Sequence, residues 1–237
     1  MFIKSVGLEP IRDDTYVRDL PVVRHLAKHG RLRLTAPVTL LVGDNGAGKS
    51  TLVEAIAVAA GFDAAGGPLR APEFRGQGHR TESTLSRWLT LRGKNIPPRG
   101  YFLRAETHYD TVTIMDTLPA TGRRRHEMSH GESVLSVLGE QMGGAGLYVF
   151  DEPESGLSVI RQMALVAEID QAVLRGGQFI IATHSPIMMA IPNAGIIQIT
   201  EDGISETVFE EAEAVLAMRE FLDDPKETIR YILGRNY

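Results

Sequence analysis

The stretch GDNGAGKST, residues 43–51, places three glycines within six residues and follows them with a lysine and two hydroxyl side chains. The apolar run Val38–Val42 precedes it and reads as a strand buried on both faces. The residues after it, from Lys49 to about Ala59, favour a helix. The stretch fits the pattern G-x-x-x-x-G-K-[ST] between a strand and a helix, and it therefore predicts a loop that cradles phosphate groups.

Each residue type in this loop has a physical reason. Glycines let the backbone turn tightly and bring its N–H groups against phosphate oxygens, and the helix that follows adds its positive end. Lys49 is expected to reach the β- and γ-phosphates of a nucleotide and to act in catalysis, while the Ser50 hydroxyl is expected to hold Mg²⁺. The predicted nucleotide contacts are Asp44, Asn45, Gly46, Ala47, Gly48, Lys49, Ser50 and Thr51.

Buried strands alternate with helices along the rest of the chain. Strands are predicted near 2–8, 31–34, 38–42, 101–105, 146–150, 178–183 and 195–200, the last with a hairpin partner from residue 203. Helices are predicted near 22–28, 49–59, 83–91, 132–142, 159–174 and over most of 210–233. This alternation predicts an α/β fold whose mainly parallel sheet is flanked by helices. We expect one domain over residues 1–237, with a small helical and loop insertion at about 61–127.

The composition narrows the class of protein. The chain has 237 residues and no cysteine, which excludes disulfides and thiolate metal sites. No apolar run approaches membrane-spanning length, and the start, MFIKSVGLEP, lacks the apolar core of a signal peptide. The sequence thus leads us to expect a soluble, cytoplasmic protein.

Carboxylates follow a second buried strand, in LYVFDEPE at residues 147–154. The carboxyl ends of strands in such sheets are where ligands bind. Asp151 is expected to hold Mg²⁺, through water, and Glu152 to polarise an attacking water molecule. An acidic turn without function is the alternative, and the phosphate loop elsewhere in the chain makes that reading weaker.

Two further motifs have both structural and functional readings. In MSHGES, residues 128–133, Ser129 and Glu132 form a capping box, and the same helix start is an anion site. In ATHSP, residues 182–186, His184 follows a buried strand and can titrate near neutrality. A lone histidine is usually structural. At a strand end among these motifs, we expect His184 to lie near the γ-phosphate.

In this order, GDNGAGKST, SHGES, LYVFDEPESGLS and IIATHSP resemble the motifs of an ABC-type ATPase, a class of P-loop NTPase. The Ser-x-Gly-Glu signature, and Pro-Glu after Asp-Glu, look closer to SMC, RecF and related soluble ATPases than to transporter subunits. The resemblance implies ATP and Mg²⁺ as cofactors and a head-to-tail homodimer across ATP. It implies that Ser129, Gly131 and Glu132 of one subunit contact the nucleotide bound by the other.

The sequence also departs from the family pattern. His130 replaces the usual second-position glycine of the signature, and Ser158 stands where an aspartate is common. No clear glutamine follows a strand to bind the metal, so Glu106 is the preferred candidate and Gln77 a weaker one. Tyr16 is the candidate for stacking on adenine. The interval between the phosphate loop and the signature is too short for an SMC coiled coil.

Three functions fit these motifs. The favoured one is a soluble ATPase that dimerises on ATP and drives a change in a nucleic acid or protein partner. The alternatives are the ATP-hydrolysing subunit of a membrane transporter, with a membrane partner less favoured, and a binding switch with little turnover. Glu152 argues against the switch, since a pure switch needs no carboxylate to activate water.

Charge is uneven along the chain, whose formal net charge is −5. Residues 70–125 hold eleven Arg or Lys against five Asp or Glu, and residues 201–237 hold four against ten. Among these cations are Arg70, Arg75, Arg80, Arg87, Arg92 and Arg123–Arg125. They are expected either to pair with acidic residues or lie in water, the slightly preferred reading, or to make a sequence-independent contact with nucleic acid phosphates.

Overall fold

A seven-stranded sheet is the centre of the computed structural model, which describes residues 1–70, 83–93, 97–107 and 130–234. The strand order is β10-β9-β3-β8-β7-β6-β4. The bounds are β3 (Val38–Gly43), β4 (Gly67–Pro68), β6 (Gly100–Arg104), β7 (Leu147–Asp151), β8 (Gln178–Ala182), β9 (Gly195–Thr200) and β10 (Gly203–Thr207). The strands from β9 to β6 run parallel, and β10 and β4 pair antiparallel at the two edges. The predicted mainly parallel sheet is confirmed.

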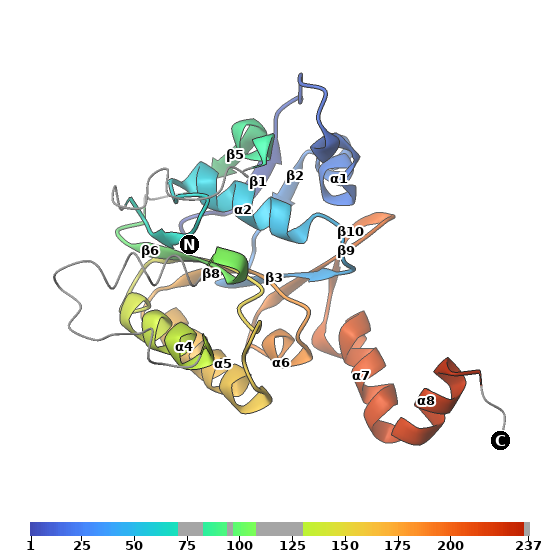
Figure 1. Ribbon diagram of the computed structural model, residues 1–237. Helices are drawn as coiled ribbons and strands as arrows, with labels where there is room; N and C mark the ends of the chain where they lie inside the picture. The colour runs from blue at the N-terminus through green and yellow to red at the C-terminus, as the bar shows by residue number, and fades with distance from the viewer. Residues whose placement is uncertain (71–82, 94–96, 108–129, 235–237) are drawn as a thin grey trace.

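Helices cover both faces of this sheet (Figure 1). On one face lie α1 (Pro21–His29) and α2 (Lys49–Ala60), and on the other lie α4 (His130–Gln141), α5 (Val159–Leu174) and α6 (Pro186–Met189). Because side chains alternate along a strand, β7 supplies Tyr148 and Phe150 to the core with α4 and α5. Leu147 and Val149 of the same strand enter the core with α2. This two-sided burial is the reason that the strand is apolar throughout.

A smaller antiparallel sheet of order β2-β1-β5 lies beyond α2. Its strands are β1 (Ser5–Leu8), β2 (Arg31–Arg33) and β5 (Leu89–Arg92). The helix predicted over 83–91 is wrong: a 3-10 helix, η3 (Thr84–Trp88), is followed by β5, which pairs with β1. Leu89 and Leu91 alternate with polar residues and both pack in the core beside α2, so the strand period of two prevails here.

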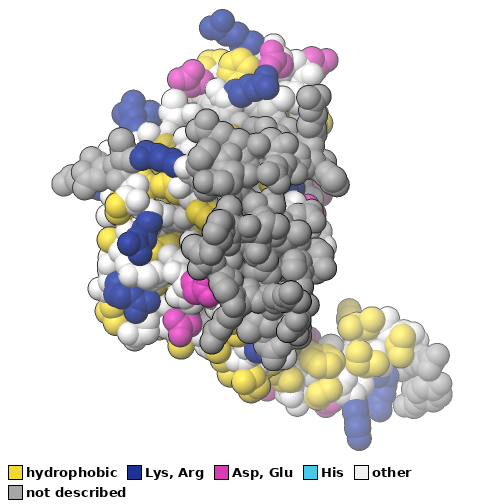
Figure 2. Space-filling view, turned by 60° about the vertical axis from the view of Figure 1, so that its left-hand side comes forward, with side chains coloured by type: hydrophobic (Ala, Val, Ile, Leu, Met, Phe, Trp, Pro, Cys, Tyr) yellow, Lys and Arg dark blue, Asp and Glu magenta, His cyan; other side chains and the backbone are white. Residues whose placement is uncertain are grey.

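The C-terminal segment consists of η6 (Phe209–Glu211), α7 (Glu213–Asp223) and α8 (Pro225–Ile232). The predicted helical segment is divided at Asp224 and Pro225, because proline disfavours a helical residue before it and lacks the N–H that would continue the helix. We call residues 213–234 the C-terminal arm. Beyond its first residues, which pack against the core, the arm extends away from the rest of the described molecule (Figures 1 and 2). Within the described ranges, no helix combines the length and the hydrophobicity needed to span a bilayer.

Candidate functional site

The phosphate loop joins the end of β3 to the start of α2, as the sequence predicts. Gly43 and Gly48 have φ angles of 128° and 92°, in the region that favours glycine. At Gly43 a Cβ atom would lie 1.9 Å from the carbonyl oxygen of Ile199, and at Gly48 one would lie 2.8 Å from Val22 of α1. Two of the three glycines are therefore required by the fold around the loop.

Lys49, the first residue of α2, is 4% exposed and lies under the loop. Its ammonium group donates hydrogen bonds to the carbonyl oxygens of Gly43, at 2.8 Å, and of Asp44, at 2.6 Å. Burial lowers the pKa of Lys49, while the charge of Glu152 and then that of Asp44 act to raise it. The loop thus wraps around a buried cation at the place where phosphate charge is expected.

Asp151 ends β7 beside the phosphate loop and is 7% exposed. Burial raises its pKa to about 6, against the opposing effect of a hydrogen bond with Ser50. Its Oδ1 atom is buried and has no hydrogen-bond partner. A buried carboxylate oxygen without a partner, next to a serine hydroxyl, suits Mg²⁺, which takes one or two protein oxygens and otherwise binds phosphates and water.

Replacing Asp151 by Asn should stabilise the nucleotide-free protein, and more so at pH 8 than at pH 5. The raised pKa means that this carboxyl contributes stability below about pH 4 that is lost as the pH rises to about 6. The extra gain at pH 8 is expected to be about 1.5 kcal/mol, a few degrees in melting temperature. Thermal unfolding of both proteins at the two pH values measures it. Asp202→Asn, an exposed change in a turn, is the control, and an equal gain for Asp151→Asn at both pH values would contradict the argument.

Glu152 and His184 face each other at the ends of neighbouring strands. His184 Nε2 lies 3.7 Å from Glu152 Oε1, and both side chains are partly exposed. Glu152 has a φ of 51°, which is uncommon for a residue other than glycine, and its N–H donates to the carbonyl oxygen of Ala182. Strained backbone of this kind gathers at functional sites, and here it directs a carboxylate beside the phosphate loop.

Glu154 is a site residue that sequence reasoning missed. Its Oε1 atom accepts hydrogen bonds from the Thr183 hydroxyl and the His184 N–H, both at 2.7 Å. Glu154 therefore fixes the backbone that carries His184. The sequence DEPE contains this second glutamate, two residues after Glu152. Its role could not be predicted because its partner, His184, lies thirty positions further along the chain.

A second chain of hydrogen bonds links the start of α5 to the same strand end. The Ser185 hydroxyl donates to Gln162 Oε1 at 2.7 Å and accepts from N–H groups at the start of α6. Gln162 in turn donates to the carbonyl oxygen of Leu157, at 3.0 Å. The turn after the acidic strand is thus tied to the segment that holds His184.

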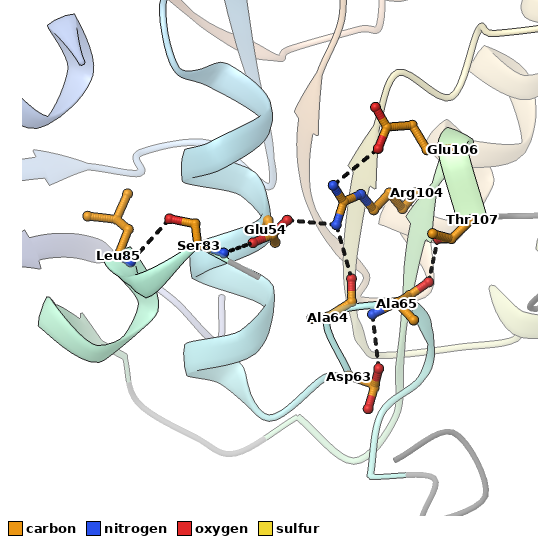
Figure 3. A network of polar contacts seen from close by, with 9 residues as sticks. All are labelled: Glu54, Asp63, Ala64, Ala65, Ser83, Leu85, Arg104, Glu106 and Thr107. Carbon is orange, nitrogen blue, oxygen red and sulfur yellow. Dashed lines mark hydrogen bonds and ion pairs between the residues drawn. The ribbon is translucent and has the colours of Figure 1, made fainter. Parts of the chain in front are cut away.

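Arg104, at the end of β6, connects the site to α2 and to the start of the predicted insertion (Figure 3). Its guanidinium donates to Glu54 of α2 at 2.7 Å and to the Ala64 carbonyl oxygen at 3.4 Å. The other oxygen of Glu54 accepts from the N–H of Ser83. Glu54 lies one helical turn beyond Ser50, so this ion pair ties the metal-binding end of α2 to β6. It also shows that at least one cation of the basic stretch has a structural role.

Glu106, the predicted metal ligand, lies in the 3-10 helix η4 (Ala105–Thr107) directly after β6. Its side chain is 78% exposed, and its carboxylate is paired with Arg104 at 3.2 Å. Arg104 is the register partner of Asp151, so Glu106 lies at the correct edge of the sheet. Its role as a ligand stays a prediction.

Six of the eight predicted residues of the phosphate loop meet Glu152 and His184 in one cavity of about 180 Å³, while Asp44, Ala47 and Asp151 do not line it. Its lining residues are Leu20, Asn45, Gly46, Gly48, Lys49, Ser50, Thr51, Glu152 and His184. Leu20, at the start of α1, was not predicted. Tyr16, the adenine candidate, is exposed in η1 (Tyr16–Asp19), the turn just before it. Across the part of the chain that is described, no group of three or more His, Asp or Glu side chains is placed to hold a metal alone.

The signature prediction lies partly outside the described residues, and the structure gives only the backbone of its residues 130–132. Ser129 and Gln77 are outside them, as are Arg75, Arg80 and Arg123–Arg125. Gly131 and Glu132 fall in the first turn of α4, so the predicted helix after the signature is confirmed. The roles of Ser129, Gly131 and Glu132 remain predictions.

Comparison with known proteins matches both halves of the site. The family described as "AAA domain" matches residues 23–84, which include the phosphate loop. The family described as "AAA domain, putative AbiEii toxin, Type IV TA system" matches residues 104–190, which include Asp151, Glu152 and His184. A curated relative, the cytochrome c biogenesis ATP-binding export protein CcmA of Gluconobacter oxydans (strain 621H), is 29% identical over 153 residues. The aligned region spans 62% of this chain and 68% of the relative.

Solved structures with this fold include ATP-binding proteins of transporters. An ATP-binding subunit of an ABC transporter is 12% identical, with a TM-score of 0.50, covering 90% of this chain and 94% of its own. A nucleotide-free ATP-binding cassette from an ABC transporter is 16% identical, with a TM-score of 0.50, covering 95% and 97%. An SMC head domain from Thermotoga maritima is 16% identical, with a TM-score of 0.46, covering 88% and 99%. At these identities the two transporter proteins, with TM-scores of 0.50, show the shared fold alone, so the preference for a soluble ATPase over a transporter subunit stays a prediction.

Proposed function

We propose that this ABC-type P-loop ATPase hydrolyses ATP at a site that a second copy of the chain completes. The observation that carries the proposal is the shared cavity, where Lys49 and Ser50 of the phosphate loop meet Glu152 and His184. Phosphoryl transfer to water uses a positive phosphate-binding loop and a group that orients the attacking water, and here the adjoining Glu152 and His184 can supply that group.

Different residues of the chain would bind the phosphates, hold the metal ion and activate the water. Loop N–H groups and Lys49, now held by two carbonyl oxygens, would donate to phosphate oxygens. Ser50 and Asp151 would hold Mg²⁺, which supplies positive charge against the phosphates when bound. Glu152 would accept a proton from the attacking water, and His184, held by Glu154, would contact the γ-phosphate.

The second copy of the chain would contribute its signature residues to the site. The resemblance to ABC-type ATPases implies that residues 129–132 of one subunit cover the ATP bound to the other, in a head-to-tail ATP dimer. The site of one chain supports this arrangement because the Glu152 and His184 side chains remain partly exposed, and an active phosphoryl-transfer site excludes water. A lone subunit would therefore hydrolyse ATP slowly.

A membrane partner is a second candidate, favoured by one observation. The curated relative is named as an ATP-binding export protein. If this chain has a similar role in export, it would act together with a membrane component. The proposal of a soluble partner rests on the motif style and on the basic stretch of residues 70–125. The described cations of that stretch include Arg70, Arg87 and Arg92.

The ATPase rate of purified protein, measured alone and with duplex DNA, RNA or native membranes, tests the function and separates the candidates. We expect slow turnover alone and a several-fold rise with one of the three. If nucleic acid is the partner, its binding should weaken steeply as salt rises, because phosphate contacts release counterions. Failure to bind or hydrolyse ATP under any condition would contradict the proposal.

A further inference from the structure

The C-terminal arm packs against the core only at its root, residues 212–215, and the rest of the arm is largely exposed in the described structure. At the root, Ala212 and Val215 are buried in the core, and Ala214 packs against it. No residue of α8 is buried. The helix is capped locally, since Asp224 accepts the N–H of Glu227 and the Thr228 hydroxyl donates to the Asp224 carbonyl oxygen. Among the described residues, α8 contacts α7, for example through the hydrogen bond from the Thr228 hydroxyl to the Glu220 carbonyl oxygen, and it buries no side chain of its own. A helix of eight residues is marginal in water without further packing, so a larger partner surface would stabilise it.

Large apolar side chains cover the bare part of the arm, and Figure 2 shows them on the side turned to the viewer. Those that are exposed are Leu216, Met218, Phe221, Leu222, Ile229, Tyr231, Ile232 and Leu233. Tyr231 is 84% exposed and Ile232 is 68% exposed. Scattered single apolar residues are ordinary on a protein surface, but a set this dense on two adjoining helices marks an interaction surface.

The charges on the arm indicate the class of partner. Residues 213–234 carry five acidic and three basic side chains. Helices that lie on membranes are rich in Lys and Arg on their polar face, and a nucleic acid surface is basic. A net acidic, apolar helical hairpin therefore suits neither lipid headgroups nor nucleic acid, and it suits the surface of a protein.

The area of this surface and its position favour a second copy of the same chain. An aromatic side chain carries about 150–250 Å² and an aliphatic one somewhat less, so these two aromatic and six aliphatic side chains, which are 37–84% exposed, leave on the order of 700 Å² per copy. That is about the area each partner contributes to a stable interface. The arm carries charges of both signs, since Arg219, Lys226 and Arg230 lie close in sequence to acidic residues. Two arms related by a twofold axis can therefore place some basic side chains of one arm opposite acidic side chains of the other.

The root of the arm also begins beside the candidate site. Glu213, Ala214 and Ala217 of α7 line a cavity of about 320 Å³ together with Asp44, Asn45 and His184. If two chains face each other across this site, the arms of both chains therefore begin at the interface between them.

We propose that the C-terminal arm pairs with the same arm of a second copy, and that this pairing requires no nucleotide. The four helices form a bundle that buries the apolar faces of both arms. The pairing holds two candidate sites near each other before ATP binds. ATP-driven dimerisation of the two sites then takes place within one assembly. The pairing of the arms raises the effective concentration of each site near the other. The arm pairing is separate from the ATP dimer and stands or falls by its own test.

Sedimentation of nucleotide-free protein carrying Lys49→Ala, which removes the predicted ATP contact, tests the pairing. We expect a dimer at micromolar concentration. Adding Leu222→Asp and Ile232→Asp should give a monomer, with the dissociation constant raised more than a hundredfold, because four carboxylates would enter one apolar interface. Leu174→Asp, an exposed leucine on α5 outside the arm, is the matched control and should remain a dimer. Circular dichroism checks that each variant folds.

Cross-linking gives a second measurement, because the chain has no cysteine. A bis-maleimide should join two copies of Ile232→Cys without nucleotide, and it should leave Leu174→Cys single. A Lys49→Ala protein that sediments as a monomer at about 50 μM overturns the proposal, as does a dimer that both aspartates leave intact. The proposal is also overturned if the monomeric protein binds lipid vesicles through the arm. It is overturned as well if the helices of the arm become stable only when a different protein is bound. Loss of ATP-driven dimerisation alone leaves it standing and counts against the proposed function.

Discussion

A Glu152→Gln variant is expected to bind ATP as the wild type does and to hydrolyse it about a hundredfold more slowly, or slower still. The reason is the position of this carboxylate, 3.7 Å from His184 and next to the phosphate loop, where an attacking water would lie. Glutamine keeps the size of the side chain and loses the ability to accept a proton. Because the side chain is partly exposed, the change should leave the fold intact.

Single-turnover hydrolysis and nucleotide-binding titration measure this effect separately. Glu168→Gln is the matched control, since Glu168 is exposed on α5 away from the cavity, and its rate should equal that of the wild type. Wild-type turnover by Glu152→Gln would show that another group activates the water.

Lys49→Ala is expected to abolish measurable turnover and to weaken ATP binding by about a hundredfold. Its ammonium is the cation buried beneath the loop, held 2.6 Å from the carbonyl oxygen of Asp44. Charge-assisted hydrogen bonds to phosphate are among the stronger interactions in proteins, roughly 1.5–3 kcal/mol each, so losing two of them accounts for the expected change.

Isothermal titration with ATP and Mg²⁺ measures the affinity of this variant. Lys28→Ala, at an exposed lysine of α1, is the control for loss of a positive charge. Since Lys49 also bonds to the loop backbone, its variant needs a thermal unfolding curve beside the binding data. Unchanged affinity and rate in a folded Lys49→Ala protein would refute the assignment.

The parts of the site that the sequence predicted are those encoded by short, local patterns. GDNGAGKST lies between a strand and a helix as expected, and Asp151, Glu152 and His184 lie at strand ends. In a parallel sheet those strand ends meet at one edge, so predicting each strand was enough to bring these residues together.

The parts that were missed depend on partners far apart in the chain. Glu54 and Arg104 are fifty residues apart, and nothing near either of them specifies the ion pair. Glu154 lies in a motif that was noticed, but its role depends on which strand lies next to β7. The helix expected over 83–91 failed because β1 offers a free edge to Leu89–Arg92, and tertiary pairing decided between strand and helix.

In the proposed dimer, each hydrolytic site takes Glu152 from one copy and the signature, residues 129–132, from the other. Mixing two inactive proteins tests it directly. Glu152→Gln lacks the carboxylate and Ser129→Arg blocks the signature, so neither should hydrolyse ATP alone. In a mixed dimer, one site combines the intact Glu152 of the Ser129→Arg copy with the intact Ser129 of the Glu152→Gln copy. ATPase activity should return on mixing, to about a quarter of the wild-type value when equal amounts of the two copies pair at random, and a mixture as inactive as its components would contradict the shared site.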